Sequence, residues 1–186
     1  MTTLRNCVAC GLCENRQNIV CPDGDVNSPV AFVGEAPGKR EDETGLPFQG
    51  RSGKVLDALL NEENISRSSI YITNTVKCRP PGNREPTKEE MAACLPNLKE
   101  ELQNRRLIVA LGRTAARDLL GREIKLADEL NKLTTINILG KEIDMIATYH
   151  PAASFYNSKV KDALSETIRI AKKYLEGYKT ASTIKI

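Results

Sequence analysis

Residues 30–53 read VAFVGEAPGKREDETGLPFQGRSG. The apolar run Val30 to Val33 ends directly at Gly34, which is the pattern of a buried strand that runs into a loop. A second glycine-rich stretch follows, and apolar residues then recur at helical spacing between positions 55 and 60. The segment therefore predicts a strand, a long loop and a helix, which together form the building unit of an α/β fold.

Outside this segment, short β-rich runs alternate with amphipathic stretches through most of the chain. Further strands are expected at residues 70–73, 107–111, 135–139 and 143–149, the last two paired around Gly140. Further helices are expected from about residue 88, at 114–120 and at 159–174. This alternation predicts one α/β domain with a parallel sheet covered by helices. In such sheets ligands bind at the carboxyl ends of strands, which points to the loops that begin at Gly34, Asn74, Gly112 and His150.

The helix expected near residue 88 has a clear start and an unclear end. Thr87 is followed three residues later by Glu90, which is the spacing of a capping box. Pro96 lacks the N–H that a helix interior needs, so we expect it to end, kink or divide this helix.

Composition limits the class of protein. The chain has 186 residues and a mass of 20.5 kDa, and 40% of the residues are apolar, which suffices for one packed core. The longest apolar runs are roughly a quarter of the ~20 residues of a membrane helix, and the first residues lack a signal-peptide core. We therefore expect a soluble, unexported protein. The net charge of +3 does not by itself imply a polyanionic partner. With no Trp, three Phe and five Tyr, a base-stacking platform must consist of one or two rings.

Six cysteines in an unexported chain indicate a metal site or catalysis, because a reducing cytosol keeps thiols free of disulfides. They are Cys7, Cys10, Cys13, Cys21, Cys78 and Cys94. Pairs at two-residue spacing suit either a closed zinc site or an iron–sulfur cluster, although a single histidine disfavours an imidazole-rich zinc site. A local ferredoxin-type motif would use Cys21, but the seven residues before it exceed the usual gap. A metal-free protein in which Cys94 is a core residue is the remaining alternative.

The glycine-rich loops after residue 33 and before residue 54 resemble loops that bind phosphates through backbone N–H groups. The chain contains neither a Gly-Lys-Ser/Thr motif nor a Gly-x-Gly-x-x-Gly motif. A nucleotide site is therefore only weakly indicated, and the loops are more informative when they are taken together.

GEAPGKREDETGLPFQG, ITNTVKCRPPGNREPT and HPAAS closely resemble the motifs of the iron–sulfur (family 4, or type 4) uracil-DNA glycosylases. The resemblance spans residues 5–175, with Cys7 and Cys10 ahead of these motifs and Cys94 behind them. It implies a three-layer α/β/α fold with a central, mostly parallel four-stranded sheet, in a single domain of residues 1–186. It also implies a [4Fe-4S] cluster held by Cys7, Cys10, Cys78 and Cys94, with residues 1–28 as the cluster-bearing extension. Cys13 and Cys21 fall outside the family pattern.

The activity implied by the resemblance is removal of uracil from DNA, which leaves an abasic site for base excision repair. The best-known cluster-free type carries an Asp where this chain has Ala36, so that water-activating carboxylate is missing here. Covalent uracil-trapping relatives carry a Gln at this place and a reactive His at the end of a basic loop. Since His150 is the only histidine, covalent trapping by that loop is not expected.

The resemblance also implies roles in recognising a flipped base. Phe48 is the ring beneath uracil, and its alternative is a core phenylalanine. Asn74 reads N3–H and O4, or else is a turn residue that ends a strand. Glu41 fills the space beside uracil C5 and rejects thymine, or else is a solvated loop residue. Gly34, Glu35 and Ala36 complete the expected substrate-binding set.

Catalysis should be electrostatic, because departing uracil gains negative charge while the sugar becomes positive. His150 is expected to donate to uracil O2, and backbone N–H groups around Glu35 and Ala36 to add an oxyanion-type site. Glu35 is the candidate for positioning water or stabilising the sugar cation, with Glu41 and Asp42 as competitors.

Residues 152–156 should form the loop that wedges into the vacated base stack, with Ser154 and Phe155 at its tip. Basic residues beside the loops are candidates for phosphate contacts: Lys77, Arg79, Arg84, Lys159 and Lys161. The expected partner is uracil-containing DNA, with no membrane, and the expected state is a monomer in the cytoplasm, at the nucleoid. Two alternatives stay open: an iron–sulfur redox protein, and a relative that binds uracil in DNA without cleaving it.

Overall fold

The computed structural model describes residue 4 and residues 6–183. These residues form one six-stranded sheet in the order β1-β3-β2-β4-β6-β5. The strands are β1 Asp23–Gly24, β2 Val30–Gly34, β3 Tyr71–Asn74, β4 Leu107–Leu111, β5 Leu133–Ile138 and β6 Lys141–Thr148. The four inner strands are parallel, whereas β1 and β5 pair antiparallel at the two edges. The predicted mostly parallel sheet is confirmed, but its predicted size of four strands is wrong, because two antiparallel edge strands extend it.

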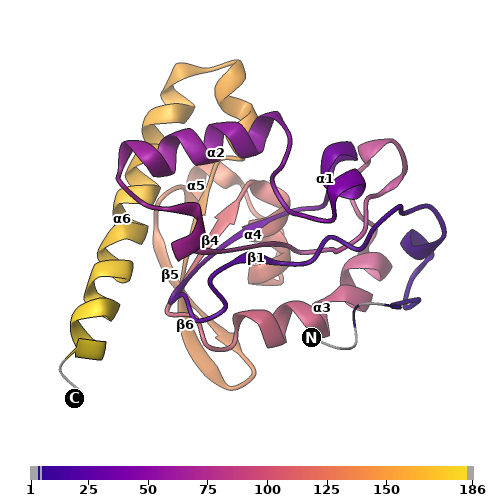
Figure 1. Cartoon of the computed structure of the whole chain (residues 1–186), viewed down its shortest axis with the longest axis horizontal. Coiled ribbons are helices and arrows are strands. Elements are labelled where there is room, and N and C mark those ends of the chain that lie inside the picture. The colour runs from indigo at the N-terminus through magenta and orange to yellow at the C-terminus, as the bar shows by residue number, and fades with distance from the viewer. Residues whose placement is uncertain (1–3, 5, 184–186) are drawn as a thin grey trace.

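Helices cover both faces of this sheet (Figure 1). They are α1 Lys39–Thr44, α2 Arg51–Glu62, α3 Lys88–Leu102, α4 Arg113–Leu120, α5 Leu126–Glu129 and α6 Ser158–Thr183. Successive side chains of a strand point to opposite faces, so β2 and β4 contribute to two separate cores. Phe32 and Val109 pack with α2 and α6, whereas Val33 and Ala110 pack with α3 and α4. This division confirms the three-layer α/β/α arrangement.

Two helices differ from the sequence prediction. The capping box of α3 is present, since Thr87 Oγ1 accepts from Glu90 N at 3.2 Å and Glu90 Oε2 accepts from Thr87 N at 2.8 Å. Pro96 neither ends nor divides α3, because Leu98 and Leu102 continue its buried face beyond the proline. A proline inside a helix removes one backbone hydrogen bond, and this packing outweighs that loss. The C-terminal helix α6 also continues past the predicted end at residue 174.

The carboxyl ends of the parallel strands bring the predicted loops to one edge of the sheet. Gly34 and Asn74 end β2 and β3 as register partners. Gly112 follows β4 with a φ of 101°, and a Cβ at this position would lie 3.2 Å from His150 Cβ. Glycine is therefore needed here, both for this backbone conformation and for the close approach of the His150 loop.

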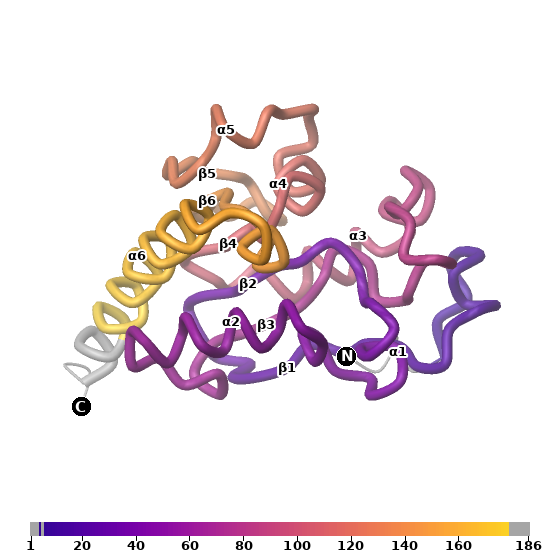
Figure 2. The backbone as a smooth tube through the Cα atoms, turned by 90° about the horizontal axis from the view of Figure 1, so that it is seen from above, coloured from indigo at the N-terminus to yellow at the C-terminus, as the bar shows by residue number. Residues whose placement is uncertain are grey.

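The N-terminal extension and the far end of α6 lie at opposite ends of the molecule (Figures 1 and 2). The extension contains one short 3₁₀ helix, Gly11–Glu14. Three more 3₁₀ helices lie in the loops, at Arg67–Ser69, Pro81–Asn83 and Pro151–Phe155. Within the described residues, no helix is long and apolar enough to cross a membrane.

Candidate active site

A cavity of about 270 Å³ opens where the loops after β2, β3 and β6 meet. Its walls include six of the residues that the sequence predicts for the site: Glu35, Ala36, Glu41, Phe48, Asn74 and His150. These residues are far apart in the sequence, and the fold brings them around one volume. The cavity is therefore the candidate active site.

The Phe48 and His150 rings lie next to each other in the wall of this cavity. Their centroids are 5.9 Å apart and their planes differ by 28°. Gly34 lets the surrounding side chains approach β2, because a Cβ there would lie 2.7 Å from Phe48 Cζ and 2.5 Å from Asn74 Oδ1. Phe48 also belongs to the main core, so it is both a packed phenylalanine and a cavity wall. One of its ring faces is a candidate stacking surface.

Asn74 is held at the end of β3 by the backbone around it. The residue is only 4% exposed, and its carbonyl oxygen accepts from Lys77 Nζ at 2.7 Å. The next residue, Thr75, donates its hydroxyl to the Glu35 carbonyl at 2.7 Å, which ties the loops after β2 and β3 together. The Asn74 amide therefore borders the cavity from a fixed backbone.

His150 presents a defined tautomer to the cavity. Its Nδ1 accepts from Ala152 N at 3.3 Å, so the ring proton of the neutral imidazole lies on Nε2. Burial lowers the pKa of His150 below its ordinary value, and the nearby Glu41 charge opposes this shift. At neutral pH the side chain is thus an uncharged hydrogen-bond donor.

Glu41 cross-links the two glycine-rich loops beside the cavity. Its Oε1 accepts from Gln49 N and Gly50 N, both at 2.7 Å, and its Oε2 accepts from Gly38 N at 3.1 Å. The residue is 8% exposed, so the alternative of a solvated loop residue is wrong. Asp42 points elsewhere, because Oδ1 accepts from Gln17 N at 2.9 Å in the N-terminal extension.

Glu35 is the remaining carboxylate candidate for the reaction. The residue is half-buried and lines the cavity. Burial raises the pKa of Glu35, a hydrogen bond with Thr114 opposes the rise, and the negative charges of Glu85 and Asp118 add to it. A carboxyl group in these surroundings changes its charge at a higher pH than an ordinary glutamate.

Comparison with known proteins agrees with this geometry. The model of the uracil DNA glycosylase superfamily matches residues 21–172. The chain belongs to that superfamily. Within it, the type-4 uracil-DNA glycosylase of Saccharolobus solfataricus is 39% identical over 179 residues, covering 92% of this chain and 83% of the relative. The type-4 uracil-DNA glycosylase of Pyrobaculum aerophilum is 42% identical over 156 residues, covering 81% of this chain and 80% of the relative. That of Thermotoga maritima is 38% identical over 183 residues, covering 93% of this chain and 91% of the relative.

These relatives confirm the resemblance to the type-4 glycosylases, and the structure adds cavity residues that sequence reasoning missed. Pro37, Gly38 and Ser52 belong to the glycine-rich stretches that were already predicted to matter, with Ser52 in the first turn of α2. Pro80, Asn83 and Arg84 form a cavity wall that was not foreseen. The available signal was the stretch PPGNRE, in which Gly82 and Asn83 adopt positive φ angles of 63° and 56°.

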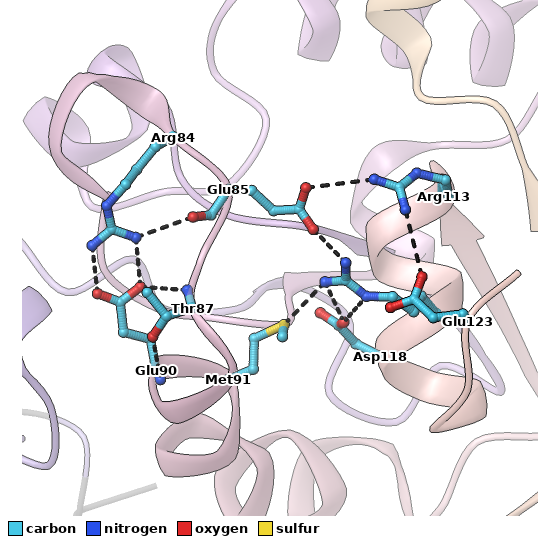
Figure 3. A network of polar contacts seen from close by, with 9 residues as sticks. Arg84, Glu85, Thr87, Glu90, Met91, Arg113, Asp118 and Glu123 are labelled. Carbon is cyan, nitrogen blue, oxygen red and sulfur yellow. Dashed lines mark hydrogen bonds and ion pairs between the residues drawn. The ribbon is translucent and has the colours of Figure 1, made fainter.

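The loop that carries this unforeseen wall is held by ion pairs on both sides (Figure 3). Arg84 donates to Glu90 Oε1 at 2.6 Å and to Oε2 at 2.8 Å. Glu85 pairs with Arg113 and Arg117 of α4. Arg84 was predicted to contact phosphate. Its guanidinium pairs with Glu90 at the cavity wall while the side chain stays 44% exposed, so phosphate contact by Arg84 stays a prediction.

The predicted wedge lies beside the cavity and not in it. Ser154 and Phe155 belong to the 3₁₀ helix Pro151–Phe155 and line a separate groove next to α2. The Arg51 guanidinium lies over the Phe155 ring, 4.6 Å from its centroid. Phe155 is 40% exposed and the following Tyr156 is 91% exposed, so Tyr156 is the more accessible of the two rings.

Five cysteines converge on a second, small cavity of about 10 Å³: Cys7, Cys10, Cys13, Cys78 and Cys94. Arg16 Nη1 donates to Cys78 Sγ at 3.4 Å, and Cys21 is exposed and does not line this cavity. A [4Fe-4S] cluster takes four thiolates, and the thiols around this cavity are enough to supply them, so the donor set fits the predicted group.

Proposed function

We propose that the chain is a monofunctional glycosylase that flips uracil out of DNA and hydrolyses its N-glycosidic bond, leaving an abasic site. The observation that carries this proposal is the neutral His150 donor in one cavity with the Phe48 ring and the Asn74 amide. Uracil offers a flat ring to stack, an O4 acceptor with an N3–H donor to read, and an O2 that gains charge as the bond breaks.

Recognition follows from the types of group around the cavity. Phe48 stacks on the flipped base, and the Asn74 amide donates to O4 while it accepts from N3–H. Glu41 positions the loop wall beside C5, where the extra methyl group of thymine would collide. Because three backbone N–H groups hold the Glu41 carboxylate, this wall has little room to retreat.

Bond cleavage relies on charge stabilisation. His150 Nε2 donates to O2, and the hydrogen bond strengthens as uracil becomes an anion. Backbone N–H groups around Glu35 and Ala36 supply further positive potential. The ionised Glu35 carboxylate positions water and stabilises the positive sugar, since Asp42 is occupied by the N-terminal extension.

The raised pKa of Glu35 predicts the acid limb of the pH profile. Activity should need the ionised form, so it is full above this pKa and falls about tenfold per pH unit below it. Protonation of His150 would break the hydrogen bond from Ala152 N to Nδ1, and burial lowers the pKa of His150, so this change belongs at a lower pH than in an ordinary histidine. Single-turnover rates are measured from pH 4 to 8. In the native enzyme the fall in rate should be centred at a pH above the ordinary glutamate pKa of about 4.3, and in Glu35→Gln this fall should be absent. An unchanged limb in Glu35→Gln would assign it to another group.

Cys7, Cys10, Cys78 and Cys94 are proposed to hold a [4Fe-4S] cluster, supported by their convergence and by the type-4 relatives. When bound, the cluster supplies a rigid cross-link between the N-terminal extension, the loop after β3 and α3. It carries no part of the bond cleavage. Cys13 lines the same cavity, so its exclusion from the ligand set rests on the family pattern.

Iron content tests this ligand set. Cys78→Ser and Cys94→Ser should lose iron and destabilise the fold, while Cys13→Ser and Cys21→Ser should keep iron and the brown colour. The measurements are iron per chain and visible absorbance, with Cys21→Ser as the matched control because this thiol is exposed. Loss of iron in Cys13→Ser, or full iron in Cys78→Ser, would favour a local N-terminal cluster.

We further propose that residues 1–186 act as one domain, with residues 1–28 as the extension, and that the enzyme is a monomer at the nucleoid. The loop of residues 152–156 enters the vacated base stack, and both Phe155 and Tyr156 are available as wedges. Arg79, Arg84, Lys159 and Lys161 remain candidates for phosphate contacts.

One assay tests the function directly. Purified protein is incubated with a uracil-containing oligonucleotide without any electron donor, and abasic sites are measured. We expect abasic sites at uracil and none at thymine or cytosine. Their absence would contradict the proposal, and binding to the same oligonucleotide would then separate a non-cleaving uracil binder from a redox protein.

A further inference from the structure

Lys77 is a buried lysine between the candidate active site and the cysteine cavity. It was predicted to contact phosphate, but that prediction is wrong, because its side chain is only 1% exposed. The ammonium group donates to Thr73 Oγ1 at 2.6 Å, to the Asn74 carbonyl at 2.7 Å and to Glu101 Oε2 at 2.7 Å. An ammonium group has three protons, and here each has one acceptor. The side chain therefore has a single defined position.

The backbone of Lys77 contacts the other site. Lys77 lines the cysteine cavity together with Cys94 and directly precedes Cys78. Its carbonyl accepts from Val20 N at 2.8 Å, which ties the N-terminal extension to the same residue. One residue thus contacts the cysteine cavity on one side and the Asn74 peptide on the other.

Stability alone explains this arrangement poorly. Removing two charges from water costs about as much as their mutual attraction returns, so a buried ion pair is often no better than two packed apolar side chains. Two neighbouring polar atoms, Glu101 Oε1 and Tyr71 Oη, are also buried without a hydrogen-bond partner. The ion pair instead fixes the position of the end of β3 relative to α3. Both Cys94 and Glu101 belong to α3.

We propose that Lys77 is a positioning residue for uracil recognition, because it holds the Asn74 peptide against α3 at the wall of the cysteine cavity. The inference rests on the proposed function, since it assumes that Asn74 reads the base. The ammonium group holds the Asn74 carbonyl, and this peptide determines where the side-chain amide points. A merely structural lysine would change stability but not the preference for uracil.

The test is the ratio of two dissociation constants in the iron-loaded enzyme. One DNA carries a non-cleavable 2′-fluoro uracil nucleotide, and the other carries the cytosine equivalent, because the Asn74 amide matches O4 and N3–H of uracil and mismatches cytosine. Lys77→Met combined with Glu101→Met removes both charges and keeps unbranched side chains of similar length. We expect this variant to keep iron and to lose on the order of tenfold in the uracil-to-cytosine ratio, equivalent to one buried hydrogen bond.

Arg105→Met is the matched control. Arg105 is another buried cation, which lines neither cavity and donates to the carbonyls of Val26, Ser28 and Glu101 at 2.8, 2.6 and 3.1 Å. Arg105 touches the backbone of Glu101, so Arg105→Met leaves the Lys77–Glu101 ion pair in place. It should lower the melting temperature without changing the ratio. If the double variant loses iron or fails to fold, Thr73→Val keeps the shape and both charges, and it removes one acceptor of the ammonium group and one donor to Glu101 Oε2. It should give a smaller loss of the same sign.

The outcomes separate this inference from the proposed function. If the native enzyme does not prefer uracil, the proposed function fails. If the native enzyme prefers uracil and the iron-loaded variants keep the native ratio, the role of Lys77 is overturned. An equal loss in Arg105→Met would also overturn it, because the effect would then be general destabilisation.

Discussion

His150→Ala is expected to slow single-turnover release of uracil by ~10²–10³-fold, the usual effect of removing one donor to a developing anion. The dissociation constant for uracil-containing DNA should change little, because the hydrogen bond to O2 is weak before the bond breaks. Its Nδ1 accepts from Ala152 N, and burial lowers the pKa of His150, so Nε2 of a neutral ring points the remaining proton at the substrate.

A conservative variant makes this measurement specific. His150→Gln retains a side-chain donor and should lie between the native enzyme and His150→Ala. Native cleavage in His150→Ala would reduce His150 to a residue that only accepts from Ala152 N.

The inner strands were predictable because burial on both faces leaves a continuous apolar run. All five residues of β2 and of β4 are buried, and a glycine ends each apolar run, Gly34 inside β2 and Gly112 just after β4. β1 has two residues, Asp23 and Gly24, whose strand character depends on pairing with Ile72 and Tyr71 of β3. No local pattern marks such a strand, so the sequence pattern missed β1, whereas it did predict the other edge strand at residues 135–139.

The candidate site was predictable where residues directly follow strands, as Asn74 and His150 do. Lys77 was misjudged because lysine beside a loop usually lies at the surface, and its counterion Glu101 lies 24 residues away in the chain. The wall formed by Asn83 and Arg84 was missed for a similar reason. Its position depends on ion pairs with α3 and α4, and the local sequence of these helices does not indicate which residues they will contact.

Asn74→Asp is expected to lower uracil cleavage on the order of 10–100-fold, because the carboxylate has no donor for O4 and a lost buried hydrogen bond costs ~1–3 kcal/mol. Cytosine reverses the pattern of uracil, with an N4 amino donor and an N3 acceptor. The native Asn74 amide therefore meets cytosine with two mismatches, whereas a carboxylate at this position can accept from N4. Cytosine should become relatively less disfavoured in the variant.

The pH dependence of this change identifies Asn74 as the reader. An ionised carboxylate repels the cytosine N3 lone pair, while a protonated carboxyl donates to N3 and accepts from N4, so cytosine release should improve towards mildly acidic pH. Release of both bases is measured for the native enzyme, Asn74→Asp and Asn83→Asp from mildly acidic to mildly basic pH. Asn83→Asp is the matched control, because Asn83 lines the same cavity but its Oδ1 accepts from Arg79 Nε at 2.6 Å, a bond that a carboxylate preserves. If Asn74→Asp keeps native uracil activity and an unchanged preference, the base is read from another wall of the cavity, and the loop of Asn83 and Arg84 is the wall that remains.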